Sequence, residues 1–424
     1  MASIAAPVPS LGRVAWPLGV LALGMAAGFA AMGSFGTVQE SAKAELLLSD
    51  RTLGLVQGVA AAVPLALFSV PVGIMVDRWN RVRLFLALAM LWTLGTLLTA
   101  YAPDAASLFV ARMMTGTGAT GALTAALSLA ADLCQPAQRG RAMLVVTLGK
   151  TLGMAAGFGL VGTMFGGLGD GIFGLPAWRG VHVALAAILA LCLLPLLTLR
   201  EPARREVATQ NALLGIVARE LWTRRGFLAP LFLGQVSVVM ADNSALIWAA
   251  PVLGRHYGLG PDQFAGWMGA LIFGTGLGGA ILGGLAADWG QRSGRRGGVL
   301  RGALIAAAIG APAALFPVAG SVPLFAVAMG VLVLCGTVTG LITSVALTVL
   351  IPNEARGLCI GLFIAVAGVI GFGIAPSMVA WVSGMMGGEG HLAPALAIVG
   401  VVTGVIAVVA FALAIRNAPA APVR

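Results

Sequence analysis

Three ionisable side chains lie deep inside long apolar stretches of this sequence, where they could bind a charged solute. They are Arg112, Lys150 and Asp242. Ionisable groups at membrane depth are energetically costly and usually mark a substrate or ion pathway. Asp242 is followed by Asn243 and comes seven residues after Gln235, a spacing that puts Gln235 and Asp242 on one face of a helix. Two cations and one carboxylate predict a site for an anionic or zwitterionic solute.

Lys150 is the residue whose role is most open. It follows Arg141 by nine residues, about 13 Å along a helix, which puts it near the middle of a bilayer. No acid nearby in the sequence can neutralise it. Three interpretations follow: Lys150 binds an anionic solute, it forms an internal ion pair with Asp242 or another acid, or its ammonium snorkels toward the membrane surface.

The elements that carry these residues are apolar segments. Of 424 residues, 59% are hydrophobic and 9% are charged, whereas a soluble domain has about 25% charged residues. Lipid forces each spanning segment to satisfy its own backbone hydrogen bonds, so the segments should be helices. We expect an all-α integral membrane protein with two pseudo-symmetric six-helix bundles, residues 1–199 and 227–424, joined by a cytoplasmic linker at 200–226. The expected spans are 14–38, 52–76, 84–101, 107–131, 142–165, 180–199, 227–250, 263–287, 302–319, 322–350, 358–382 and 393–415.

The basic charge predicts an orientation rather than a nucleic-acid partner. Lys and Arg number 25 against 15 Asp and Glu, a net charge of +10. With both termini in the cytoplasm, nineteen of these cations lie in cytoplasmic segments and four in outer ones, as the positive-inside rule requires. Topology and contact with anionic lipid account for the excess. We therefore expect a multi-pass protein of the inner cell membrane with no nucleic-acid partner.

The sequence offers no constellation for catalysis or for a metal. Its cysteines are scattered singly, and its three histidines lie near the outer ends of spans without a metal-binding spacing. We expect no catalytic residue, no metal and no cofactor, and hence no enzyme. The residues concerned are Cys134, Cys192, Cys335, Cys359, His182, His256 and His391.

Two pairs of motifs show that the halves repeat. Residues 73–77 and 284–288 both read Gly-x-x-x-Asp and lie 211 residues apart, while residues 139–140 and 356–357 both read Arg-Gly and lie 217 apart. Internal repeats of six spans are the plan of alternating-access transporters, which bind their substrate near the midplane between the halves. The alternative function is that of a membrane receptor that binds a solute without transporting it.

At these residues the chain resembles a known superfamily. The loop after the second span resembles the GxxxDRxxRR signature of the major facilitator superfamily, and Arg112 with Gly116 and Gly118 is similar to its RxxxGxG element. The loop residues are Gly73, Asp77, Arg78, Arg81 and Arg83.

Within that superfamily the chain resembles the bacterial Spinster-like transporters over nearly its whole length. This resemblance implies a monomeric alternating-access transporter of a small organic solute, amphiphilic or anionic. A proton-coupled drug or metabolite efflux antiporter is the alternative, although the fifth span lacks the Pro-containing GPxxGG element of many such antiporters. The stretches that carry the resemblance are 45–54, 178–179, 199–202, 248–251 and 371–376.

The groups that would couple transport to protons in that subfamily are missing here. The resemblance implies an Asp-Arg pair in the first span and a Glu in the fourth. Aligned with this sequence, these positions hold Ala31, Met32 and Ala119. Protons then enter through another group, for which Asp242 is the candidate, or the protein is a facilitator without a coupling ion.

The repeated loop motifs predict a gate at the cytoplasmic face. A carboxylate there can sit over the N-terminus of a helix in the other half, which is worth roughly 0.3–1 kcal/mol. By the repeat, Asp77 would face the helix start near Gly357, and Asp288 the helix start near Gly140. Asn80 stands where the signature has Gly, and we expect it to keep a left-handed turn. The gate residues are Gly73, Asp77, Arg78, Arg81, Arg83 and Asp288.

A run of small residues in the fifth span predicts close helix packing. Gly149, Gly153 and Gly157 recur every four residues. Such GxxxG steps line one face of a helix and let a neighbouring backbone approach.

Overall fold

The computed structural model describes residues 11–135, 138–169, 171–172, 174–204, 222–351 and 353–419. Within these ranges it is helical and contains no β-strand, only one isolated bridge between Ile172 and Leu175. Ten of the described helical segments are long and apolar enough to cross a membrane. The expectation of an all-α integral membrane protein is thereby confirmed, and the count of twelve spans stays a prediction.

The first bundle is built around α1, which packs against α5, α6 and α7, while α4 packs against α5 and α7. Two of the twelve expected spans are not among the ten apolar helices counted above. One is the second span, formed by η1 and α3, where η1 is a π-helical turn, and the other is the fourth span, α5, which is rich in Gly, Ala and Thr. The elements are α1 (Leu11–Glu45), α2 (Asp50–Gly54), η1 (Leu55–Val59), α3 (Ala60–Arg78), α4 (Arg81–Tyr101), α5 (Ala105–Leu133), α6 (Arg139–Leu168) and α7 (Ala177–Leu196).

The second bundle repeats this plan. Here α9 packs against α12 and α15, α10 packs against α12, and α11 packs against α12 and α15. The elements are α9 (Arg225–Tyr257), α10 (Pro261–Arg292), η3 (Gly298–Leu300), α11 (Arg301–Ala313), η4 (Phe316–Val318), α12 (Val322–Leu350), α13 (Asn353–Ala367), η5 (Gly368–Ile374), α14 (Ala375–Met385), η6 (Glu389–His391) and α15 (Leu392–Asn417). Most of the expected linker, residues 205–221, lies outside the described residues.

The glycine run of the fifth span packs as expected. Methyl groups added at Gly149 or Gly153 would overlap backbone carbonyls of α1, and one at Gly157 would lie 2.5 Å from the carbonyl oxygen of Ala30. The backbones of α1 and α6 are therefore in direct contact along three turns. The GxxxG prediction is confirmed, and α6 has no room for larger side chains on this face.

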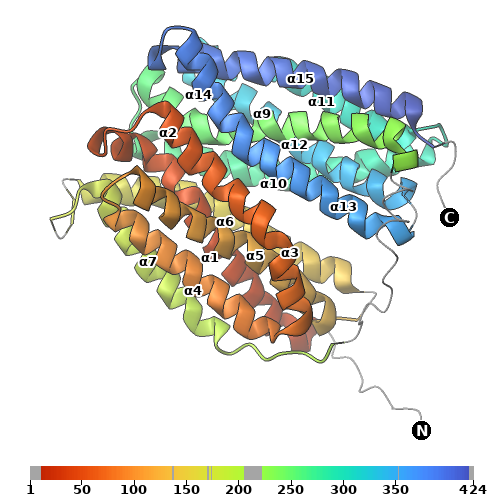
Figure 1. The fold of residues 1–424 in the computed structure, drawn as a ribbon, viewed down its shortest axis with the longest axis horizontal. Coiled ribbons are helices and arrows are strands. Elements are labelled where there is room, and N and C mark those ends of the chain that lie inside the picture. The colour runs from red at the N-terminus through yellow and green to blue at the C-terminus, as the bar shows by residue number, and fades with distance from the viewer. Residues whose placement is uncertain are drawn as a thin grey trace.

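The two bundles touch most extensively where α6 meets α10 and where α3 and η1 meet η5, and α1 and α2 add smaller contacts with α9 and α14. Glycines mediate the two main contacts: an added Cβ at Gly269 would lie 2.7 Å from the Ala155 carbonyl oxygen, and one at Gly58 of η1 would lie 2.6 Å from that of Phe372. The bundles come together at the end that carries α2 and the end of α14, and diverge toward the end where α1 begins and α15 finishes (Figure 1).

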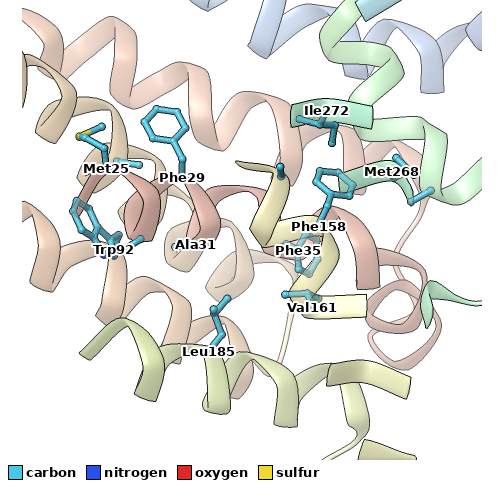
Figure 2. Packing of buried hydrophobic residues seen from close by; sticks show 14 of the residues in the cluster. Met25, Phe29, Ala31, Phe35, Trp92, Phe158, Val161, Leu185, Met268 and Ile272 are labelled. Atoms are coloured by element: carbon cyan, nitrogen blue, oxygen red, sulfur yellow. The ribbon is translucent and has the colours of Figure 1, made fainter. Parts of the chain in front are cut away.

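The apolar core of the first bundle surrounds α1 and continues toward the second bundle. Met25, Phe35 and Trp92 are fully buried in it. Figure 2 shows Phe158 of α6 between Phe35 of α1 and the α10 side chains at the bundle contact. This packing surrounds α1, whose backbone and Phe side chains contact the cations described next.

Candidate functional site

A cavity lies between the two bundles. Its enclosed volume is about 70 Å³, below the roughly 300–1,000 Å³ of small-molecule sites, so an organic solute can bind only when the bundles move and the cavity widens. Both bundles contribute to its wall, and most of its side chains are apolar. The lining residues are Met32, Gly33, Gly36, Val56, Gln57, Ala61, Arg112, Gly116, Met154, Phe158, Asn243, Leu246, Ile247 and Phe372.

Arg112 is the one permanently charged side chain among the residues that line this cavity. Its guanidinium donates from Nη1 to the carbonyl oxygen of Ala31 at 3.1 Å and from Nη2 to that of Met32 at 2.5 Å. It also lies 5.4 Å from the ring centre of Phe35. Its Nε is buried without a partner. Backbone carbonyls thus stand where the resemblance implied an Asp-Arg pair, and they orient the cation without neutralising it.

Lys150 of α6 also contacts α1, close in sequence to the carbonyls that hold Arg112. Its Nζ lies 5.2 Å from the ring centre of Phe29, a cation–π contact. Within the described part of the chain it makes no hydrogen bond or ion pair, so the alternative of an ion pair with Asp242 is not seen in this conformation. Lys150 does not line the cavity itself but lies one helical turn from Met154, which does.

The three candidate residues of α9, namely Gln235, Asp242 and Asn243, point in two directions, toward α12 or into the cavity. Gln235 and Asp242 share a face, as their spacing predicts, and this face packs on α12: the Thr343 hydroxyl donates to Gln235 Oε1 at 3.0 Å, and the Asp242 carboxyl lies against Gly336. Asn243 instead lines the cavity, with its amide donating to the Val239 carbonyl of its own helix at 3.0 Å. The structure therefore brings Arg112 and Asn243 to one cavity and places Gln235 and Asp242 beside it.

Two glutamines that the sequence did not single out are hydrogen-bonded to each other, and one of them, Gln57, lines the cavity. Gln57 Nε2 donates to Gln39 Oε1 at 3.2 Å, and Gln39 Nε2 donates to the Ile247 carbonyl at 2.6 Å. The second of these bonds joins α1 to α9 and so crosses between the bundles. Sequence alone gave one signal for them, namely polar side chains within apolar helices.

Beyond the glutamines, five charged residues link the bundles; we call them the outer latch. Arg255 of α9 donates to Glu40 and to Asp50 of the first bundle, with all four distances at 2.7–2.8 Å. Lys43 pairs with Asp50 at 2.6 Å and with Glu389 of η6, whose other oxygen accepts from the Asp50 backbone N–H at 2.8 Å. The latch holds the α2 end of the molecule closed.

Asp50 is the buried centre of the outer latch, with 3% of its side chain exposed. Burial acts to raise the pKa of its carboxyl. Hydrogen bonds and charge attraction from Arg255 and Lys43 outweigh that effect and lower the pKa below the ordinary value of 3.8. Asp50 therefore stays ionised in the closed latch.

The predicted gate residues lie at the opposite end and are mostly exposed. Asp77 and Asp288 make no hydrogen bond or ion pair with any described residue, and an added Cβ at Gly73 or Gly140 would meet open space. The side chains around Gly357 lie outside the described residues. Arg78 and Arg83 are likewise exposed. The helix start predicted to receive Asp77 thus lies outside the described side chains, and the gate stays a prediction.

Arg81 behaves differently from the other loop arginines because it is buried. It pairs with Asp132 of α5 at 2.5 Å and with Glu201 at 2.7 Å. Glu201 also accepts from the Val82 backbone N–H at 3.0 Å. Arg81 thus ties the loop to the rest of its own bundle rather than to the other one.

Asn80 does not adopt the left-handed turn that we expected. Its φ is −68° and its ψ is 114°, an extended conformation, and its side chain accepts from the Arg83 N–H at 2.8 Å. Asn80 is therefore the N-cap of α4. The expectation was wrong because an asparagine before a helix satisfies a free N–H in an ordinary backbone conformation.

Comparison with known proteins places this fold and cavity in a family. The chain belongs to the Major Facilitator Superfamily, whose family model matches residues 20–260. It is 32% identical over 234 residues to the 3-(3-hydroxy-phenyl)propionate transporter of Escherichia coli (strain K12), a match that covers 54% of this chain and 53% of that one. The matched part thus spans about half of that relative. The family and this relative are transporters, not enzymes, as expected.

Solved structures share the fold across nearly the whole chain. A bacterial homologue of the human lysosomal transporter Spinster, in an inward-facing and unoccupied conformation, matches with a TM-score of 0.79 and 22% identity, covering 96% of this chain and 98% of that one. The nucleoside transporter NupG matches with a TM-score of 0.78 and 14% identity, covering 93% and 99%. The fold is therefore that of the Spinster homologue.

Proposed function

We propose that this protein is a monomeric, Spinster-like transporter that moves a small amphiphilic organic anion across the inner membrane by alternating access. The observation that carries the proposal is the state of Arg112. Its charge is buried at the cavity wall, is held by two carbonyls and meets no carboxylate among the described residues. A buried cation without a counter-charge is costly, and a bound organic anion would supply one.

The surroundings of Arg112 favour an anion that also has an apolar part. The cavity places Phe158 and Phe372 within reach of a solute bound at Arg112, and Met32, Leu246 and Ile247 add further apolar wall. Lys150 adds a second cation, one helical turn along α6 from the cavity residue Met154. The E. coli relative is named for an aromatic carboxylate, which makes 3-(3-hydroxy-phenyl)propionate a suitable first probe.

We further propose that twelve spans cross the membrane in two bundles with both termini in the cytoplasm. In that orientation the outer latch lies outside and the exposed gate residues Asp77 and Asp288 face the cytoplasm. The conformation described here is then inward-facing. On opening outward the latch breaks, and Asp77 and Asp288 dock at the opposing helix starts.

The proposal is tested with purified protein in liposomes, measuring uptake of radiolabelled 3-(3-hydroxy-phenyl)propionate. Uptake should saturate, and aromatic or alkyl carboxylates should compete with it while their neutral amides and organic cations should not. The variant Arg112→Gln should lose at least tenfold in initial rate, and Arg112→Lys should keep part of it. The matched control is Arg416→Gln, an exposed arginine outside the cavity.

Three results would each overturn part of this account. Competition by organic cations alone would favour the drug-efflux alternative. Saturable binding without flux would favour a receptor. Equal flux in the parent and in Arg112→Gln would remove Arg112 from the site.

A further inference from the structure

Asp242 sits in a cradle formed by the opposite helix. Gly336 of α12 faces it, and a Cβ added there would lie 2.7 Å from Asp242 Oδ1 and would overlap Oδ2. Any residue other than glycine at this position would therefore push the carboxyl out. One turn along, Gly340 is different, because an added Cβ there would meet only Gln235 Nε2 at 3.6 Å, an ordinary contact.

The carboxyl in this cradle has no cation beside it. Its Oδ1 is buried and has no hydrogen-bond partner. No described Lys, Arg or His forms an ion pair with it, and its face-mate Gln235 is engaged with Thr343. Both cations of the site contact α1 instead, Arg112 near Phe35 and Lys150 at Phe29.

The helices packed against the middle of α9 also bring no charge to Asp242. Neither α12, η5 nor α14 contains a charged residue, and α15 has Arg416 in its last turn. The charged residues of α1, α10 and α13 lie in their first or last two turns. Cys335, next to Gly336, is the one titratable residue of α12.

We propose that Asp242 in the Gly336 cradle is the proton-binding site of this transporter, which rests on the function proposed above. An ionised carboxylate without a partner in such a place is strongly disfavoured. Binding a proton removes the charge and gives the carboxyl a donor. The group therefore holds a proton in this conformation and ionises only when it gains access to water or to a cation.

Position along α9 links this proton to the solute. Asn243, the next residue, lines the cavity, and Asp242 is itself partly exposed. A negative charge at Asp242, beside the cavity, would repel an anion bound in it, whereas the protonated form would not. Anion binding and protonation therefore favour each other, and this coupling is reciprocal. The expected mode is movement of a proton together with the organic anion.

The first measurement uses the unmodified protein in weakly buffered detergent with a pH-sensitive dye. At a pH high enough that part of the protein has lost the Asp242 proton, adding 3-(3-hydroxy-phenyl)propionate should cause proton uptake by the protein. In liposomes, acid on the side from which the solute enters should raise the initial uptake several-fold. Exchange of labelled for unlabelled solute without a pH gradient should proceed in any case, because it needs no net proton movement.

The variants separate the cradle from the fold. Asp242→Asn should keep exchange and lose both the proton uptake and the effect of the gradient. Gly336→Ala should expel the carboxyl and weaken the gradient effect, whereas Gly340→Ala, with room for its methyl group, should behave as the parent. Thermal melting of each variant shows whether it is folded.

The two proposals fail in different ways. Exchange by the parent with no proton uptake and no gradient effect would overturn the proton site and leave the transporter proposal intact. A folded Asp242→Asn variant that keeps the full gradient effect would also overturn it. Absence of exchange for every organic anion tested would instead overturn the proposed function.

Discussion

Loss of Arg255 should open the end of the protein that carries α2. Arg255 donates four hydrogen bonds to Glu40 and Asp50 across the bundle interface. In Arg255→Gln these bonds are lost, and the buried Asp50 keeps Lys43 alone as a charged partner.

The size of the effect follows from the exposure of the pair. Exposed ion pairs contribute about 0.2–1 kcal/mol each, and hydrogen bonds to charged groups about 1.5–3 kcal/mol. Arg255 is 24% exposed and Asp50 is 3% exposed, so the latch falls between these limits. We expect a shift of about 1–3 kcal/mol toward the outward-open form, which is a 5- to 150-fold change in the population ratio.

The assay is a spin-label distance measurement between the two bundles at the latch end. Labels at Leu47 and Met385 suit it, because these side chains are 90% and 68% exposed. Arg255→Gln should add or enlarge a long-distance population, and Arg255→Lys should have a smaller effect. The control is Arg416→Gln, which removes an exposed arginine at the far end of α15. An unchanged distance distribution in Arg255→Gln, with Arg416→Gln also unchanged, would refute the latch as the element that closes this end.

Three further predictions concern the latch, the gate and the packing of α6. The pKa of Asp50 is lowered in the closed latch, so the stabilisation that its charge gives the latch is complete above the ordinary pKa of 3.8 and is lost as the pH falls through the lowered value. The same spin-label distance should therefore be constant between pH 5 and 8 and lengthen below about pH 4. A latch that opens as the pH rises from 5 to 8 would contradict this pH dependence. Asp77→Asn should shift the population away from the cytoplasm-closed form, read as greater labelling of cysteines placed at the gate end; unchanged labelling would contradict the gate. Gly153→Ala should lower the free energy of unfolding by about 1–3 kcal/mol, because its methyl group would overlap a carbonyl of α1, whereas Gly159→Ala, whose added Cβ meets its nearest atom at 3.9 Å, should melt like the parent; equal melting temperatures would contradict the close packing.

Local patterns predicted the helices and the face on which α6 packs. Apolar runs place helices because lipid requires satisfied backbone groups, and the spacing of Gly149, Gly153 and Gly157 needs no knowledge of the partner helix. The seven-residue spacing also put Gln235 and Asp242 on one face. Each of these properties depends on residues within one helix.

Contacts between residues that are far apart in the chain could not be predicted from the sequence. The latch joins Asp50 to Arg255 and Glu389, which lie more than 200 and 300 residues away, and each residue alone reads as a solvated loop charge. The direction of Asp242, toward α12 rather than into the cavity, depends on the absence of a side chain at Gly336. The role of Asn80 depends on where α4 begins, because an asparagine just before a helix caps it in an ordinary backbone conformation.

The most direct test of alternating access is counterflow in liposomes. Vesicles are loaded with unlabelled 3-(3-hydroxy-phenyl)propionate and diluted into a trace of labelled solute. Label should accumulate inside transiently above its equilibrium level, because the transporter carries unlabelled solute out and returns with labelled solute bound. Arg112→Gln should abolish this overshoot, and Arg416→Gln should retain it. Saturable binding of the solute by the parent with no overshoot, or an equal overshoot in Arg112→Gln, would contradict a transporter whose cavity is built around Arg112.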